Sequence, residues 1–244
     1  GTGATASSLC AGTYTCTISS PVGCTSTASF NITQPPAITS TQSQVNVTCN
    51  ATCNGSATVV AAGGTGTYTY AWAPSGGTGA TASSLCAGTY TCTISSPAGC
   101  TSTASFNITQ PPAITSTQSQ VNLTCNAVCN GSATVVAAGG TGTYTYAWSP
   151  SGGTAATASS LCAGTYTCTI SSPAGCTATA SFSITQPPAI SSTQSQVNPT
   201  CNASCNGSAT VVAAGGTGTY TYSWAPSGGT GATASSLCAG TYTC

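Results

Sequence analysis

The sequence contains no Asp, Glu, Lys, Arg or His in 244 residues, although ordinary proteins are about 25% charged. General acid–base catalysis needs a side chain that titrates near the working pH, and here only Cys and Tyr titrate. Ser and Thr are abundant, but a Ser or Thr nucleophile needs a neighbouring base. We therefore expect no catalytic residues and no enzymatic activity.

The missing charges also exclude several kinds of ligand. Calcium and magnesium sites use carboxylates, and nucleic acids are held through Lys and Arg, so we expect no metal, no cofactor and no nucleic-acid partner. No apolar run approaches the ~20 residues that span a bilayer. Cys49 and Cys53 have a C-x3-C spacing that could suggest zinc, but no His accompanies them, and we favour disulfides over metal.

A net charge of zero removes the repulsion that keeps proteins apart in solution. A protein that assembles side by side with its own copies tolerates this loss, and so does one coated in glycans. We therefore expect the partners to be other copies of the chain or neighbouring repeats.

The sequence repeats itself. The stretch LCAGTYTCTISSPAGC at Leu85–Cys100 recurs almost unchanged, and successive copies are 76 residues apart, as shown by Cys10, Cys86, Cys162 and Cys238. A fixed period must be recognised before any fold assignment. Because the sequence begins and ends inside a repeat, we expect it to be a segment of a longer array.

Paired prolines mark the expected domain boundaries. The sequence FNITQPP ends at Pro36 and again at Pro112, and FSITQPP ends at Pro188. Proline cannot donate to a strand ladder and holds the preceding residue extended. We predict domains at 1–36, 37–112, 113–188 and 189–244, with the first and last incomplete, and short stiff linkers that stack them end to end as a rod.

Short strands with turn signals between them fill the complete repeat 37–112, which indicates an all-β sandwich or barrel. Tyr68, Tyr70 and Trp72 alternate with Thr, and so do Tyr90 and Ile94 in a later segment. No segment has a helical period. The strands are expected at 38–43 with 45–48, at 56–62 before a turn, and at 67–72, 80–85, 88–94 and 100–109; the step Asn54-Gly55 is expected to form a turn.

Two details favour an immunoglobulin-like sandwich. Trp72 ends the third strand, and Tyr90 lies two residues before Cys92 in the pattern of a tyrosine corner. The usual partner cysteine on the second strand is absent, since that strand reads SATVVAA. The predicted fold is therefore a tandem array of 76-residue immunoglobulin-like sandwiches without the familiar bridge between their sheets.

The blocks CNGSATVVAAGGTGTYTYAW, LCAGTYTCTI and GCTSTASFNITQP, in this order, resemble the SprB repeat of long surface adhesins and gliding-motility proteins from bacteria of the Bacteroidetes type. The resemblance covers every repeat and implies a secreted, filamentous cell-surface protein with immunoglobulin-like or PKD-like modules. The chain departs from the family in having SSPAG where acidic residues are usual, and Cys92 where Val is common.

Seventeen cysteines indicate an oxidising, extracellular compartment. Each complete repeat has five, so one must stay free or bond elsewhere. In an immunoglobulin-like topology the corners that hold Cys53 and Cys86 lie at the same end of the sandwich. Cys92 and Cys100 flank the last hairpin, which leaves Cys49 over. The predicted bonds are Cys53–Cys86, Cys129–Cys162, Cys205–Cys238, Cys92–Cys100, Cys16–Cys24 and Cys168–Cys176, and the cysteines predicted to be unpaired or intermolecular are Cys49, Cys125 and Cys201.

A second scheme stays open. In it, Cys92 is a buried thiol that fills a Val site, as free Cys does well. Cys49 would then reach the next domain and form an interdomain bond with Cys176.

These features predict a structural segment of an extracellular filament or adhesin stalk on the cell surface. The alternative is a module that binds surface glycans, or less plausibly ice, through the outward rows Thr89, Thr91 and Thr93. The row Tyr68, Tyr70 and Trp72 could stack on sugars, but such a row is more often core. Asn54 fits a glycosylation sequon, although an Asn-Gly turn explains it without a glycan.

Overall fold

The computed structural model describes residues 3–244, and all the elements named within that range are β-strands. The chain divides into two compact units, Gly1–Pro111 and Pro112–Cys244. The division falls at the paired prolines that end the repeat 37–112. Each unit contains one complete sandwich and one incomplete set of strands.

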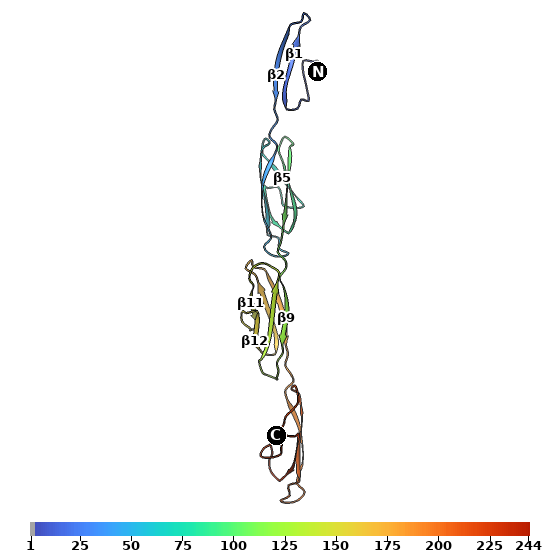
Figure 1. The fold of residues 1–244 in the computed structure, drawn as a ribbon, viewed down its shortest axis with the longest axis vertical. Helices are drawn as coiled ribbons and strands as arrows, with labels where there is room; N and C mark the ends of the chain where they lie inside the picture. The colour runs from blue at the N-terminus through green and yellow to red at the C-terminus, as the bar shows by residue number, and fades with distance from the viewer. Residues whose placement is uncertain (1–2) are drawn as a thin grey trace. The chain divides into compact units, whose positions relative to one another are not determined.

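The complete sandwich of the first unit has six strands in two antiparallel sheets. One sheet has the order β3-β4-β6 and the other β5-β7-β8, and β5 is labelled in Figure 1. The strands are β3 Thr39–Val45, β4 Gly55–Ala62, β5 Thr69–Ala73, β6 Thr81–Leu85, β7 Gly88–Ser95 and β8 Thr101–Ile108.

The second unit repeats this arrangement, with sheets β12-β10-β9 and β11-β13-β14. Its strands are β9 Thr115–Val121, β10 Gly131–Ala138, β11 Thr145–Ser149, β12 Thr157–Leu161, β13 Gly164–Ser171 and β14 Thr177–Ile184. In both sandwiches the first, second and fourth strands form one sheet, and the third, fifth and sixth form the other. This is the immunoglobulin-like order A-B-E and C-F-G, without the D strand.

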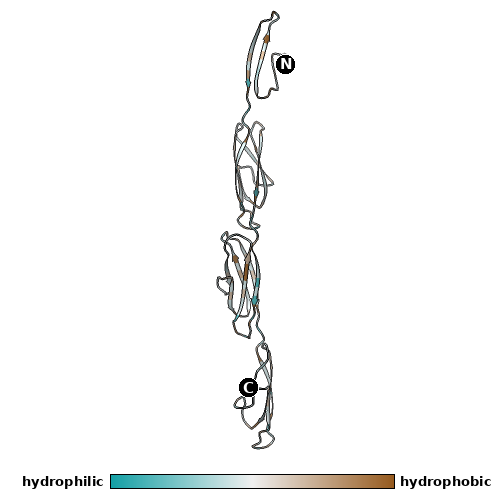
Figure 2. Ribbon diagram, viewed as in Figure 1, coloured by the Kyte–Doolittle hydropathy of each residue, from teal (hydrophilic) through white to brown (hydrophobic). Residues whose placement is uncertain are grey.

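Alternation of side chains builds the core. Tyr90, Cys92 and Ile94 of β7 point inward, while the residues between them face out, because successive residues of a strand lie on opposite faces. In register, Tyr90 lies opposite Phe106 of β8. Most of the ribbon is pale in Figure 2, with only short brown stretches, which reflects a composition of Thr, Ser, Gly and Ala around a thin core.

Trp72 belongs to the buried core of the first sandwich, and its aromatic partner lies on a strand of the same sheet. Its side chain is buried, and its ring lies 5.4 Å from that of Phe106 between centroids. Its Nε1 donates to the carbonyl oxygen of Gly79 at 2.8 Å, so the loop that replaces the D strand satisfies the buried indole. Trp148 makes the equivalent contacts with Phe182 and Ala155.

The tyrosine corner is confirmed. The hydroxyl of Tyr90 donates to the carbonyl oxygen of Cys86 at 3.3 Å, and Tyr166 donates to Cys162 at 3.2 Å. The observed strands agree with the predicted ones to within one or two residues at most boundaries. The tandem all-β sandwich architecture is therefore as predicted.

The ends of the chain form parts of sandwiches. At the N-terminal end, β1 Gly12–Ser19 and β2 Thr25–Ile32 form a two-stranded hairpin. At the C-terminal end, β15 Ser191–Val197, β16 Gly207–Ala214 and β17 Thr233–Leu237 form one three-stranded sheet. The core of this last part is small, and its buried members are Trp224, Ala234 and Leu237.

Candidate functional site

Three disulfide bonds occur at equivalent places: Cys53–Cys86, Cys129–Cys162 and Cys205–Cys238. Gly55 of β4 pairs with Leu85 of β6, so Cys53 and Cys86 flank the same end of this strand pair. The bond fastens the loop before β4 to the end of β6 within one sheet. These are three of the bonds that the sequence predicts.

The predicted bonds Cys92–Cys100, Cys16–Cys24 and Cys168–Cys176 are wrong. Cys92, Cys100, Cys16, Cys24 and Cys168 are free thiols, and Cys176 forms a disulfide that excludes Cys168. Cys100 faces Ser96 across the turn, since the amide of Ser96 donates to the carbonyl oxygen of Cys100.

The physical reason for this correction is distance along the strand. Cys92 lies four residues before Ser96, which is about 13 Å along a strand. A disulfide needs Cα atoms within about 7 Å. Two cysteines whose side chains lie on the same face of a sheet therefore do not form a bond unless they are also close along the strands.

The buried thiols fill the centre of each core. The side chains of Cys92 and Cys168 are fully buried, and Cys92 lies between Trp72 and Ala104 in register. Burial raises the pKa of the Cys92 thiol, and a hydrogen bond with the backbone of Ala71 partly opposes that rise in pKa. The pKa of Cys168 is raised in the same way. These cysteines act as small apolar residues, as the second scheme expects.

Cys49 was predicted to be unpaired or intermolecular, and the first of these is wrong, because Cys49 is disulfide-bonded. Its equivalents Cys125 and Cys201 are free and exposed. The interdomain bond between Cys49 and Cys176 in the second scheme stays a prediction. So does the intermolecular pairing of Cys125 and Cys201.

The loop 49–54 holds the end of its own repeat. Asn50 Nδ2 donates to the carbonyl oxygen of Pro111 at 3.2 Å, and the amide of Ala51 donates to Gln110 Oε1 at 2.8 Å. Asn54 accepts from the amide of Thr48 and donates to its hydroxyl. Both polar atoms of the Asn54 amide are thus used in the loop, which explains this Asn without a glycan.

The carbonyl group of the second proline of each pair is also bonded. In the second unit, the amide of Gly140 donates to Pro112 and that of Gly216 donates to Pro188. Asn126 Nδ2 donates to the carbonyl oxygen of Pro187 at 3.1 Å. Both carbonyl groups at Pro187 and Pro188 are therefore fixed by hydrogen bonds from the flanking loops.

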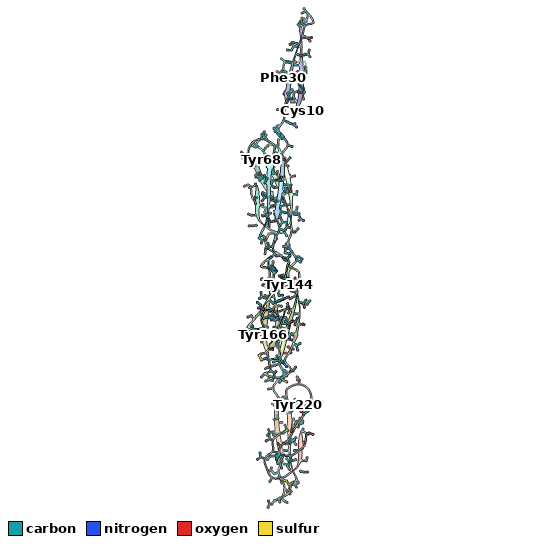
Figure 3. All side chains as sticks on the ribbon, turned by 60° about the vertical axis from the view of Figure 1, so that its left-hand side comes forward. Cys10, Phe30, Tyr68, Tyr144, Tyr166 and Tyr220 are labelled. Carbon is teal, nitrogen blue, oxygen red and sulfur yellow. A yellow bond between two sulfur atoms is a disulfide. The ribbon has the colours of Figure 1, made fainter. Side chains whose placement is uncertain are left out.

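The outward face of the β5-β7-β8 sheet consists of small and hydroxyl side chains. Thr91 faces Ser105 and Thr93 faces Thr103 across the two long strands. The aromatic row lies on the other side, because Tyr68 and Tyr70 pack against the core. The hydroxyl of Tyr68, a residue labelled in Figure 3, donates to the carbonyl oxygen of Gly63. The row is core rather than a platform for sugars.

Within residues 3–244 there is no cluster of three or more potential metal ligands. The same range contains no helix able to cross a lipid bilayer. The polar and reactive groups of the described residues are thiols, disulfides, hydroxyls and amides.

Comparison with known families finds a match at three places. The SprB repeat family model matches residues 41–79, 117–154 and 193–230. The predicted resemblance is confirmed, because the chain carries SprB repeats at these three places. Each SprB match begins inside the first strand of a repeat and ends in the loop that follows the buried Trp. It therefore ends before the fourth strand, which precedes the second cysteine of the disulfide.

Two solved structures are also similar to this chain. One is described as "Structural basis for Dscam isoform specificity", with 13% identity, 71% of this chain and 54% of that chain covered, and a TM-score of 0.27. Another is "Sidekick-1 immunoglobulin domains 1-5", with 14% identity, 84% and 53% covered, and a TM-score of 0.33. The chain spans about half the length of each. The comparison with curated proteins gives no match.

Proposed function

We propose that this SprB-repeat chain is a structural segment of an extracellular stalk or filament on a cell surface. The observation that carries the proposal is the near-identity of its complete repeats. Residues 37–112 and 113–188 differ at six positions, which are Val47/Leu123, Thr52/Val128, Ala73/Ser149, Gly79/Ala155, Ser102/Ala178 and Asn107/Ser183. A repeat with a specialised site would let its neighbours diverge, whereas repeats with one mechanical task stay alike.

The disulfides support an extracellular location, because such bonds persist in oxidising compartments. They also suit a thin core. A 76-residue unit buries a smaller fraction of its surface than a large domain does, and small domains commonly need cross-links to be stable. The disulfide that joins two exposed cysteines inside each complete repeat supplies that stability without enlarging the core.

The absence of charge suits a stalk that must keep its fold as conditions vary. Carboxylates and His residues that change protonation make stability depend on pH, and charge pairs at a surface weaken as salt rises. The SprB chain has neither. We infer that its role is non-enzymatic: the chain spans a distance from the cell surface and keeps its fold as pH and salt change. The short proline linkers limit bending between repeats.

A second candidate is a binding module. It rests on the uncharged Thr and Ser face of β7 and β8, whose hydroxyls could meet a glycan or ordered water. The inward placement of the Tyr row removes the aromatic stacking that sugar sites commonly use.

Electron microscopy of the native surface material with an antibody to residues 37–112 tests the first candidate. Labelled threads that extend from cells support a stalk, whereas label confined to a compact particle contradicts it. A glycan array probed with the chain tests the second candidate. A saturable signal that is lost on Thr91→Val plus Thr93→Val, but kept on Thr41→Val in the other sheet, would favour binding.

A further inference from the structure

Each complete repeat holds a buried free thiol and a disulfide on the same stretch of chain. In the first sandwich the disulfide joins Cys53 to Cys86, and the free thiol of Cys92 lies six residues after Cys86. In the second sandwich the free thiol of Cys168 lies six residues after the disulfide-bonded Cys162. Because a thiolate can displace one sulfur of a disulfide, this arrangement contains both reactants of an exchange reaction.

The folded sandwich keeps the two reactants apart. The side chain of Cys92 is fully buried, whereas Cys53 and Cys86 are exposed. Cys92 lies four residues beyond Gly88, where β7 begins, and this is about 13 Å along a strand. The tyrosine corner fixes the start of this segment, because the hydroxyl of Tyr90 donates to the carbonyl oxygen of Cys86 at 3.3 Å. Contact between the thiol and the disulfide therefore requires β7 to leave the sandwich.

Opening of the sandwich removes both obstacles, burial and distance. Burial raises the pKa of the Cys92 thiol, so exposure to water increases the fraction of thiolate, which is the nucleophile. The bond Cys53–Cys86 spans 33 residues, whereas a bond between Cys86 and Cys92 spans six. Closing a shorter loop costs less chain entropy. The open chain therefore favours the second bond, whereas the folded sandwich is built around the first.

We propose that Cys92 attacks the disulfide when its sandwich opens, and that the bond moves from Cys53–Cys86 to Cys86–Cys92. The Cys92 thiol gives its proton to water, and the thiolate attacks Sγ of Cys86. The bond between Cys86 and Cys53 breaks as the new bond forms, and Cys53 leaves as a thiolate that takes up a proton. The exchange consumes no oxidant or reductant. Cys168 reacts in the same way with the disulfide at Cys162.

The exchange makes an open repeat longer and prevents it from folding again. The new bond holds back six residues in place of 33, a difference of 27, so the extended chain gains about 90 Å. The native sandwich cannot contain the new bond, because β7 separates Cys86 from Cys92. The repeat folds only after the Cys53 thiolate has reversed the exchange. This inference does not depend on the stalk role, since denaturant opens a sandwich as well as tension does.

Thiol mapping of the full chain in urea tests the exchange. The chain is unfolded at pH 8.5, its thiols are alkylated after successive times, and the remaining bonds are reduced and alkylated with a second reagent. Chymotryptic peptides 31–68 and 91–106 carry Cys53 and Cys92, and each is unique in the sequence. Mass spectrometry should show the first label falling at Cys92 and rising at Cys53 at equal rates. Without urea the transfer should be at least about tenfold slower, since it then needs local opening.

Two variants identify the attacking thiol. Cys92→Val removes the nucleophile and keeps an apolar side chain in the core, so no first label should reach Cys53. The matched control is Cys100→Ser, which removes a free and exposed thiol from the same peptide. In this control the label should move from Cys92 to Cys53 at the wild-type rate.

Refolding in acid tests whether the new bond keeps the repeat open. At pH 3 few thiols are ionised, so exchange stops, and the chain has no carboxylate or His whose titration would unfold it. Trp148→Phe with Trp224→Phe leaves Trp72 as the reporter of the first sandwich. After exchange in urea and dilution into acid, the fluorescence of Trp72 should remain that of a water-exposed indole. With Cys92→Val added, it should return to that of the buried side chain.

Several results would overturn the proposal. Transfer that is absent in urea, or equally fast without urea, would mean that opening does not start the reaction. Transfer that persists in Cys92→Val would assign the attack to another thiol. Loss of label at Cys92 without a gain at Cys53 would mean that the attack falls on Sγ of Cys53. Burial of Trp72 while the Cys86–Cys92 bond persists would mean that the new bond does not hold the repeat open.

Discussion

Removal of the disulfide from one complete repeat should destabilise that repeat strongly. The variant is Cys129→Ser with Cys162→Ser in the second sandwich. Both side chains are exposed, so the substitutions remove little packing and leave no buried hydroxyl. The loss should therefore come almost entirely from the greater freedom of the unfolded chain.

The size of the effect follows from the loop that the bond closes. The sequence separation is 33 residues, and the chain-entropy relation gives a loss of about 3.7 kcal/mol at 25 °C. Small domains have only about 5–15 kcal/mol of stability in total. The variant repeat should thus unfold at a much lower denaturant concentration than its neighbour.

Urea unfolding followed by tryptophan fluorescence measures this loss. Trp72→Phe and Trp224→Phe leave Trp148 as the single reporter for the variant repeat. The matched control is Cys125→Ser, which removes an exposed free thiol and should change the free energy of unfolding by less than about 0.5 kcal/mol. A loss below about 1 kcal/mol in the double variant would refute the claim that the bond stabilises this thin sandwich.

Three further predictions concern the core and its response to pH. Cys168→Ser should cost about 2 kcal/mol because it buries an unpaired hydroxyl, whereas Cys168→Val should stay within about 1.5 kcal/mol; urea midpoints compare the two. Ser172→Ala should be neutral or stabilising by about 1 kcal/mol, since the buried Ser172 Oγ has no hydrogen-bond partner among the described residues; thermal unfolding checks the sign. The free energy of unfolding should be constant from about pH 4 to 8 and should fall above about pH 8.5. The pKa of Cys92 and Cys168 is raised in the folded protein, so the unfolded chain loses these thiol protons at a lower pH than the folded one does. A marked change in urea midpoint between pH 4 and 8 would contradict this.

Strand positions and fold class could be predicted because they depend on local pattern. Alternation around Tyr90 and Ile94 gives the inward face of β7, and the spacing of Tyr90 to Cys92 identifies the tyrosine corner. The bond Cys53–Cys86 follows once the strand order is known. Each of these inferences uses residues within one strand or two adjacent corners.

The remaining features depend on distances that the pattern does not contain. The side chains of Cys92 and Cys100 lie on the same face of the sheet, as the alternation predicts, but the two residues are too far apart along the strands for a bond. Gly55 was expected to complete a turn, and it instead begins β4 where Ile108 leaves no room for a Cβ.

Small-angle X-ray scattering on arrays of two, three and four repeats tests the central claim, that this SprB chain is a charge-independent structural stalk. The account predicts a maximum dimension that grows in proportion to repeat number, with the cross-section of one sandwich. It also predicts that both values are the same at pH 4 and pH 8 and in low and high salt. A compact particle, or a dimension that changes with pH or salt, would contradict the account.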